Sequence, residues 1–222
     1  MQVYLSNRDI RWAILNKLLI VNPAPDEEKD GYDETSIDLH LDTIDKGARV
    51  WDIEKYRAAV SSAGQQPELR LGAFHLKDFS RQYLTTVPQH GSANSTLVYC
   101  RGNEVVVKPT GFLLWTTREW VGTPKANPLY ICFVNAKSTK ARTGVVVHLS
   151  APTIHAGWQG NITLEIVNFG PFDIILQPGD AISQLTVAAI SNPPDLSLKV
   201  GESATSMQTN PSGSSNRRRG KS

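Results

Sequence analysis

The sequence predicts a mainly β fold with one helix at its N-terminus, and two observations lead to this prediction. Short runs rich in β-branched residues follow one another from residue 104 to residue 187. Turns that contain Gly and Pro separate these runs at short intervals, without the helical segments that alternate with strands in βαβ units. Such a series of short strands is typical of a β-sandwich or a distorted barrel. We therefore expect a distorted β-barrel or a jelly-roll-like arrangement.

The N-terminal helix is expected over residues 7–17. Ser6 stands where an N-cap is preferred, Asp9 follows three residues later, and apolar residues then recur at helical spacing. These apolar residues are Ile10, Ile14, Leu15 and Leu18. After the helix, Leu19-Ile20-Val21 predicts a short strand, and the polar–apolar alternation of Ser36–Leu41 predicts a half-buried one.

The remaining strands are expected where apolar runs stand between turn signals. The runs are Val105–Val107, Phe112–Trp115, Leu129–Val134, Val145–Val147, Ile162–Val167 and Ala181–Val187. The turn signals are Lys108–Gly111, Ala156–Trp158, Phe169–Pro171 and Gln177–Asp180.

One domain over residues 1–200 and a polar tail over residues 201–222 are expected. A chain of 222 residues with 40% hydrophobic residues is long enough to bury one substantial core. Residues 50–100 lack a single period, so we interpret them as an irregular insertion with a helix suggested near Ile53–Val60. The tail is predicted to be flexible, because it is polar and lacks aromatic residues.

Composition and charge argue against several classes of partner. The formal net charge of +2 is too small for a broad nucleic-acid-binding surface, so no nucleic acid partner is expected. No apolar run approaches the roughly 18 residues that cross a bilayer, so no membrane partner is expected. Cys100 and Cys132 form no C-x-x-C pair, and the N-terminus is not signal-like, which fits a cytoplasmic location. The basic cluster Arg217–Lys221 is interpreted as a solvated terminus.

The densest group of chemically capable residues begins at Lys137. The segment Lys137–Arg142 places two hydroxyls and three cations within six positions. Hydroxyls and backbone N–H groups donate to phosphate oxygens, and Lys and Arg neutralise their charge. The segment is therefore either a phosphate-binding turn or a solvated basic turn, and composition alone leaves both open.

A set of motifs extends this segment. Ser138-Thr139-x-Ala141-Arg142-x-Gly144 is followed by Val147-His148, Ala156-Gly157-Trp158-x-Gly160 and Leu164-Glu165. Leu5-Ser6-x-Arg8-Asp9-Ile10, Ser36-x-Asp38-Leu39 and Pro178-Gly179-x-x-Ile182-x-Gln184-Leu185 flank this set. Together and in this order, the motifs resemble the signature of the dCTP deaminase family, within the superfamily of dCTP deaminases and trimeric dUTPases. The 50–100 insertion and the tail lie outside the resemblance.

The resemblance implies a fold, a reaction and an assembly. It implies a dUTPase-type distorted barrel that forms homotrimers with composite active sites between subunits. It implies zinc-independent hydrolytic deamination of dCTP, a deoxycytidine nucleotide, to dUTP and ammonia. It also implies Mg²⁺ bound mainly through the nucleotide phosphates, so that no metal-binding residues of the protein are expected. The H-x-E and P-C-x-x-C segments of zinc deaminases are absent from the sequence.

The resemblance also assigns roles to individual residues. Glu165 is expected to be the acid/base residue, and burial in its β-branched run would raise its pKa toward the working pH. An exposed strand glutamate is the alternative. Ser138 and the backbone carbonyl of Ala151 would hold the attacking water, while Arg142 would position Glu165 and stabilise developing charge. The implied substrate-binding residues are Lys137, Thr139, Leu149, Trp158, Gln184 and Gln208. Trp158 would pack near the deoxyribose and exclude a 2′-hydroxyl, or it would be an ordinary core residue.

The sequence departs from the family pattern at several positions. His155 stands where the family has an aspartate that serves diphosphate hydrolysis, and Thr153 stands where a cation is frequent. We therefore expect dUTP as the product, with a bifunctional deaminase that yields dUMP and a non-catalytic nucleotide-sensing module as the alternatives. Met207-Gln208 is the nearest approach to the family's C-terminal lid, which carries an aromatic residue before its Gln. His148 is interpreted as a satisfied core or interface histidine.

Overall fold

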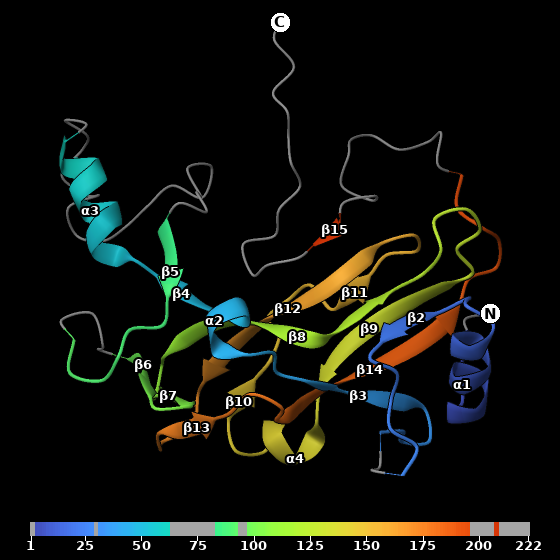
Figure 1. Cartoon of the computed structure of the whole chain (residues 1–222), viewed down its shortest axis with the longest axis horizontal. Coiled ribbons are helices and arrows are strands. Elements are labelled where there is room, and N and C mark those ends of the chain that lie inside the picture. Colours follow the sequence, from blue (N-terminus) through green and yellow to red (C-terminus); the bar gives the residue numbers. More distant parts are fainter. Residues whose placement is uncertain (1–2, 29–30, 63–82, 93–96, 196–206, 209–222) are drawn as a thin grey trace, which may run out of the picture.

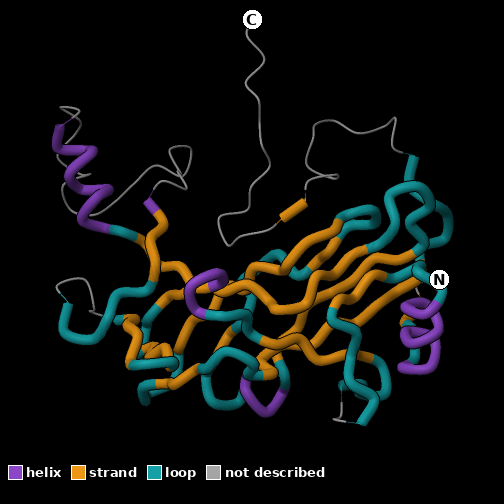
Figure 2. Tube along the Cα trace, in the orientation of Figure 1, coloured by secondary structure: helices purple, strands orange, loops and turns teal. Residues whose placement is uncertain are grey.

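The computed structural model describes residues 3–28, 31–62, 83–92, 97–195 and 207–208 (Figure 1). Strands dominate these residues, as the tube in Figure 2 shows, and one well-formed helix lies at the N-terminal edge. The prediction of a mainly β fold with an N-terminal helix is confirmed. Among the described residues the sheets stay open and do not close on themselves. No helix in these ranges is long and apolar enough to span a bilayer.

The described residues form three sheets. The five-stranded sheet has the order β1 (Val3–Tyr4), β14 (Ala181–Ala189), β9 (Tyr130–Ala136), β11 (Thr153–Ile154), with β3 (Ser36–His40) also on β14. The seven-stranded sheet has the order β10 (Val145–Val146), β12 (Gln159–Asn168), β8 (Phe112–Gly122), β4 (Ala48–Trp51), β5 (Leu84–Thr86), with β2 (Ile20–Asn22) on β8 and β15 (Met207–Gln208) on β12. The three-stranded sheet has the order β13 (Ile174–Leu176), β7 (Glu104–Val107), β6 (Val98–Arg101).

The helices in the described ranges are α1 (Asn7–Leu15), α2 (Ile44–Gly47), α3 (Ile53–Ser62) and α4 (Ser138–Ala141). The predicted capping box of α1 is present, because Ser6 Oγ accepts from the backbone of Asp9 and the Asp9 carboxylate accepts from the backbone of Ser6. The helix ends at Leu15, two residues earlier than expected. Lys17 has a φ of 58°, and this left-handed conformation cannot continue a right-handed helix.

One hydrophobic cluster joins the five-stranded and seven-stranded sheets. Leu39 and Leu185 contribute from the first sheet, and Leu113, Trp115 and Ile166 contribute from the second; all five are at most 1% exposed. Because alternate side chains of a strand point to opposite faces, the other faces are left for polar residues. This arrangement places Asp38, Gln184 and Glu165 away from the core.

Strand β8 is longer than the sequence predicts. The apolar run suggests a strand that ends at Trp115, but β8 continues to Gly122 through buried Thr117 and Glu119. Thr117 Oγ1 accepts a hydrogen bond from Ile162 N at 3.0 Å. The polar residues that follow the apolar run are buried with hydrogen-bond partners, so the strand continues through them.

The insertion is partly regular. The predicted helix is confirmed as α3, and β4, β5 and β6 show that both ends of residues 50–100 join sheets. Residues 63–82 and 93–96 lie outside the described residues, as does the predicted tail except for β15.

The buried carboxylate of Glu119 makes the stability of the fold dependent on pH. Its side chain is 4% exposed and accepts from His40 Nδ1 at 2.9 Å, from His40 N at 2.8 Å, and from Arg118. Burial acts to raise the pKa of Glu119, but the hydrogen bonds from His40 outweigh burial and hold this pKa below its usual range. A carboxyl group with a lowered pKa stabilises the fold above its unfolded pKa of about 4.3.

We therefore expect the free energy of unfolding to fall as pH drops below about 5 toward the lowered pKa of Glu119. Glu119→Gln should lower it by about 1–3 kcal/mol at pH 7 and should weaken its dependence on acid pH. Urea unfolding of both proteins at pH 7 and pH 3.5 measures the difference. Equal acid sensitivity in the two proteins would contradict this assignment.

Candidate functional site

Glu165 is held by the chain segment that follows β10. It lies in β12 opposite Leu114 of β8, and its side chain is half-buried between the buried residues Leu164 and Ile166. Leu149 N donates to Glu165 Oε2 at 2.9 Å, and Glu165 N donates to Val147 O at 3.0 Å. The carboxylate is thus fixed by a backbone donor. The other carboxylate oxygen, Oε1, has no hydrogen-bond partner in the described ranges.

The predicted phosphate-binding segment forms the short helix α4 and its flanks. Lys137 is its N-cap, the side chains of Ser138 and Thr139 are exposed, and Arg142 is the exposed C-cap residue. From α4 the chain enters β10, where Val146 pairs with Val167 of β12. The segment and Glu165 therefore belong to neighbouring parts of one sheet edge, joined through β10.

Within the described part of a single chain, no hydrogen bond or ion pair joins Glu165 to Ser138 or Arg142. Leu149 is 52% exposed, and Ala151 is also exposed in the loop that follows. The predicted catalytic residues thus share a region of the surface but form no closed site in one chain.

Lys137 and Gln184 are brought together by the five-stranded sheet. Gln184 pairs in register with Asp38 of β3 and with Asn135 of β9. Lys137 follows β9, and its Nζ forms an ion pair with Asp38 Oδ2. Asp38 Oδ1 is buried and has no hydrogen-bond partner among the described residues. The predicted phosphate-binding lysine is therefore anchored by a carboxylate of which only one oxygen has a partner among the described residues.

Sequence reasoning noted Asp38 only as part of a family motif and gave it no role. No local signal pairs it with Lys137, because the two residues are 99 positions apart and meet only through strand pairing. The backbone donor of Leu149 was missed for the same reason: a main-chain N–H carries no sequence signature.

Trp158 and Gln208 lie at the other end of β12. Trp158 N donates to His155 O at 3.0 Å, and Gly157 between them has a φ of 82°, as position i+2 of a type II turn requires. Trp158 is half-buried and packs against the core, which supports the core alternative. The backbone of Gln208 in β15 pairs in parallel with Gly160 (Figure 1).

The predicted residues therefore form two groups. Glu165 stands seven positions after Trp158, and a strand rises about 3.3 Å per residue, so the two lie roughly 20 Å apart along β12. The first group is α4, its flanks, Gln184, Leu149, Ala151 and Glu165; the second is Trp158 and Gln208.

His148 is not a satisfied core histidine in the single chain, because its Nδ1 is buried and has no hydrogen-bond partner in the described part of the chain. The interface alternative stays a prediction. It precedes Leu149, whose N–H holds Glu165.

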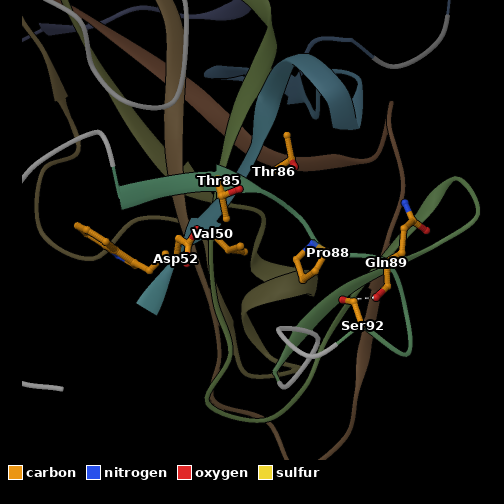
Figure 3. A pocket seen from close by; sticks show the side chains of 8 residues that line it. Val50, Asp52, Thr85, Thr86, Pro88, Gln89 and Ser92 are labelled. Carbon is orange, nitrogen blue, oxygen red and sulfur yellow. Dashed lines mark hydrogen bonds between the residues drawn. The ribbon is translucent and has the colours of Figure 1, made fainter. Parts of the chain in front are cut away.

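Two pockets in the described ranges lie elsewhere. One of about 380 Å³ lies along β4 and β5, where Figure 3 shows Val50, Asp52 and Thr85 on one side and Pro88 and Gln89 on the other. The second, of about 480 Å³, lies along α1. Neither contains a predicted site residue. In the same ranges no group of three or more His, Cys, Asp or Glu side chains is placed to hold a metal ion.

Comparison with solved structures defines the class of fold. The chain is similar to the crystal structure of 2′-deoxycytidine 5′-triphosphate deaminase from Agrobacterium tumefaciens, with a TM-score of 0.52 and 18% sequence identity. The match covers 85% of this chain and 48% of that one. The fold is thus that of a dCTP deaminase.

The family follows from the sequence as a whole. The model of the dCTP deaminase-like family matches residues 4–190, so the chain belongs to this family, and the predicted resemblance is confirmed. A dCTP deaminase of Natronomonas pharaonis is 41% identical over 92 residues, which cover 41% of this chain and 46% of that protein. The "dCTP deaminase, dUMP-forming" of Methanothermobacter thermautotrophicus is 26% identical over 200 residues, which cover 85% and 80%. The chain spans about half the length of the first three curated relatives it matches.

Substitutions of Lys137 and Asp38 test whether the ion pair between them stabilises the fold at the first group of predicted site residues. Lys137→Met should lower the free energy of unfolding by about 3 kcal/mol, because it leaves the largely buried Asp38 carboxylate without a cation. Adding Asp38→Asn should recover much of this loss, since it removes the uncompensated charge. Denaturant unfolding of the two single variants and the double variant gives the coupling energy. Additive losses would show that the two side chains do not interact.

Proposed function

We propose that the chain catalyses the hydrolytic deamination of dCTP to dUTP and ammonia, with Glu165 as its acid/base residue. Membership of the dCTP deaminase-like family supports this reaction. The observation that carries the role of Glu165 is its half-buried carboxylate, held through Oε2 by Leu149 N while Oε1 stays available.

The reaction needs a carboxylate in this state. A water attacks C4 of the cytosine ring, a proton moves from this water to N3, and the departing amine takes up a proton. One carboxylate oxygen that is oriented and another that is unoccupied suit a group that receives and returns the same proton. In this scheme Glu165 performs each transfer, and no zinc is required.

The neighbouring residues would position the water and the substrate. We assign Ser138 and the carbonyl of Ala151 to the attacking water, and Arg142 to the orientation of Glu165 and the charge that develops during attack. Lys137, Thr139 and Gln184 would bind the triphosphate, and Leu149, Trp158 and Gln208 would line the nucleoside. The ion pair with Asp38 supports the role of Lys137 in binding the triphosphate, because a lysine that is already fixed loses less side-chain entropy on binding.

Mg²⁺ would enter with the nucleotide. No set of protein donors in the described ranges is arranged as a metal site, and this hard ion prefers oxygen ligands such as phosphate and water. It would neutralise the charge of the triphosphate, while Lys137 and Thr139 orient its oxygens.

We further propose that the active site is complete only in a homotrimer. The exposure of Ser138, Arg142 and Leu149 supports this, as does the separation of roughly 20 Å between Glu165 and Trp158 along one strand. In the trimer, Trp158 at one end of β12 in one subunit would lie close to Glu165 at the other end of β12 in a neighbouring subunit.

Replacement of the acid/base residue tests the proposal. Glu165→Gln should bind dCTP but release ammonia at least about 10²-fold more slowly, because an amide keeps the shape and cannot carry the proton. Glu104→Gln on β7 is the matched control, since Glu104 is also a strand glutamate with hydrogen bonds but lies outside the predicted site. Calorimetry with dCTP and an ammonia assay give the two readouts.

Unchanged turnover in Glu165→Gln would overturn the catalytic assignment. A wild-type protein that binds dCTP and releases no ammonia would instead favour the nucleotide-sensing alternative.

A bifunctional deaminase that yields dUMP is a second candidate, because several relatives carry the name "dCTP deaminase, dUMP-forming". This chain has the exposed His155 where the family places an aspartate for that step, which supports dUTP as the product. We expect chromatography of a dCTP reaction to show dUTP accumulating without pyrophosphate. Stoichiometric pyrophosphate and dUMP would establish the second candidate.

A further inference from the structure

We infer that Thr123 is a positioning residue that fixes the turn of Trp158 and thereby sets the preference for deoxyribose over ribose in the substrate. The inference rests on the proposed function, in which Trp158 packs against the sugar. Nothing in the family motifs marks Thr123, and it is 35 positions away from Trp158 in the sequence.

Thr123 binds the turn through all three of its polar groups. Its Oγ1 accepts from Gly157 N at 2.7 Å, its N–H donates to Trp158 O at 3.1 Å, and its carbonyl accepts from Gln159 Nε2 at 3.1 Å. The residue is 2% exposed. Buried hydrogen bonds of this kind fix a segment strongly, because a broken one leaves a donor or acceptor without water.

The preceding residue shows how closely the turn lies against the end of β8. A Cβ atom on Gly122 would stand 2.2 Å from the carbonyl oxygen of Trp158, a distance that no side chain allows. The backbone of Trp158 therefore passes directly over Gly122 and is then held by Thr123. The position of the indole depends on this contact rather than on the turn alone.

A substitution can remove the Oγ1 of Thr123 without changing the backbone that carries the other two hydrogen bonds. Valine has the same shape and cannot accept the hydrogen bond from Gly157 N, whereas serine can. The loss of one buried acceptor should displace the turn and the indole together. An interaction with one hydroxyl of the substrate depends on where the indole lies. The Glu165 carboxylate is held separately, by Leu149 N, so its orientation does not depend on this turn.

The chain offers a matched control in Thr117. It lies in β8, the strand that Thr123 follows, and is fully buried, and its Oγ1 accepts from Ile162 N at 3.0 Å. In the described part of the chain its side chain has no hydrogen bond to the Trp158 turn. Thr117→Val should therefore destabilise the fold as Thr123→Val does and leave the turn in place.

The experiment compares wild type, Thr123→Val, Thr123→Ser and Thr117→Val. It measures kcat and KM for dCTP and CTP, the thermal midpoint, and hydrogen exchange of the peptide that contains Gly157. We expect Thr123→Val to lower the ratio of kcat/KM for dCTP over CTP by on the order of tenfold and to speed exchange at Gly157. Thr123→Ser should keep the wild-type ratio, and Thr117→Val should lower the thermal midpoint with the ratio unchanged.

An unchanged ratio in Thr123→Val, an equal fall in Thr117→Val, or a wild-type ratio near one would each overturn the inference. If the wild type releases no ammonia from either nucleotide, the proposed function fails on its own. The ratio of dissociation constants for dCTP and CTP, measured by calorimetry with the same four proteins, then decides the role of Thr123 by the same criteria.

Discussion

The antiparallel pairing of β8 with β12 is the interaction on which the rest of the molecule depends. It runs from Gln159 opposite Gly122 to Val167 opposite Phe112, and it forms the centre of the seven-stranded sheet. The inner face of this pair supplies Leu113, Trp115 and Ile166 to the core. Its ends carry the two groups of predicted site residues. A change in register would turn the core face outward and displace both groups at once.

The same pair explains why polar residues are buried in β8. Between Asn161 and Thr163 the register shifts, and a shift of this kind interrupts the ladder of backbone hydrogen bonds. Thr117 supplies the missing partner to Ile162 N, and the Asn161 side chain donates to the carbonyl of Thr117. The Thr117 hydroxyl and the Asn161 amide thus replace ladder hydrogen bonds that the irregular strand cannot make, so this geometry requires polar side chains at both positions.

Much of the fold could be predicted, because its signals are local. The capping box of α1, the apolar runs and the Gly157 and Gly179 turns depend on residues close in sequence, and the structure has each of them. The extent of β8 could not be predicted, because its second half is stabilised by partners on β3 and β12. The residues of the candidate site also divide into those that a local sequence signal indicates and those that it does not. Chemical type and motif order indicate Glu165, whereas Asp38, Thr123 and the Leu149 N–H become relevant only through contacts between distant strands.

The division of the site between the two ends of β12 has a physical consequence for binding. A single chain presents exposed hydroxyls and cations around α4 and a carboxylate that Leu149 holds at the surface. In contact with water such groups are solvated, and their interactions with phosphate or with a developing charge are weak. Cover from the Trp158 end of another copy would exclude water from Glu165 and strengthen these interactions. In this proposal the electrostatic environment of Glu165 would depend on assembly, whereas the hydrogen bonds of Thr123 to the Trp158 turn would govern selectivity for the sugar.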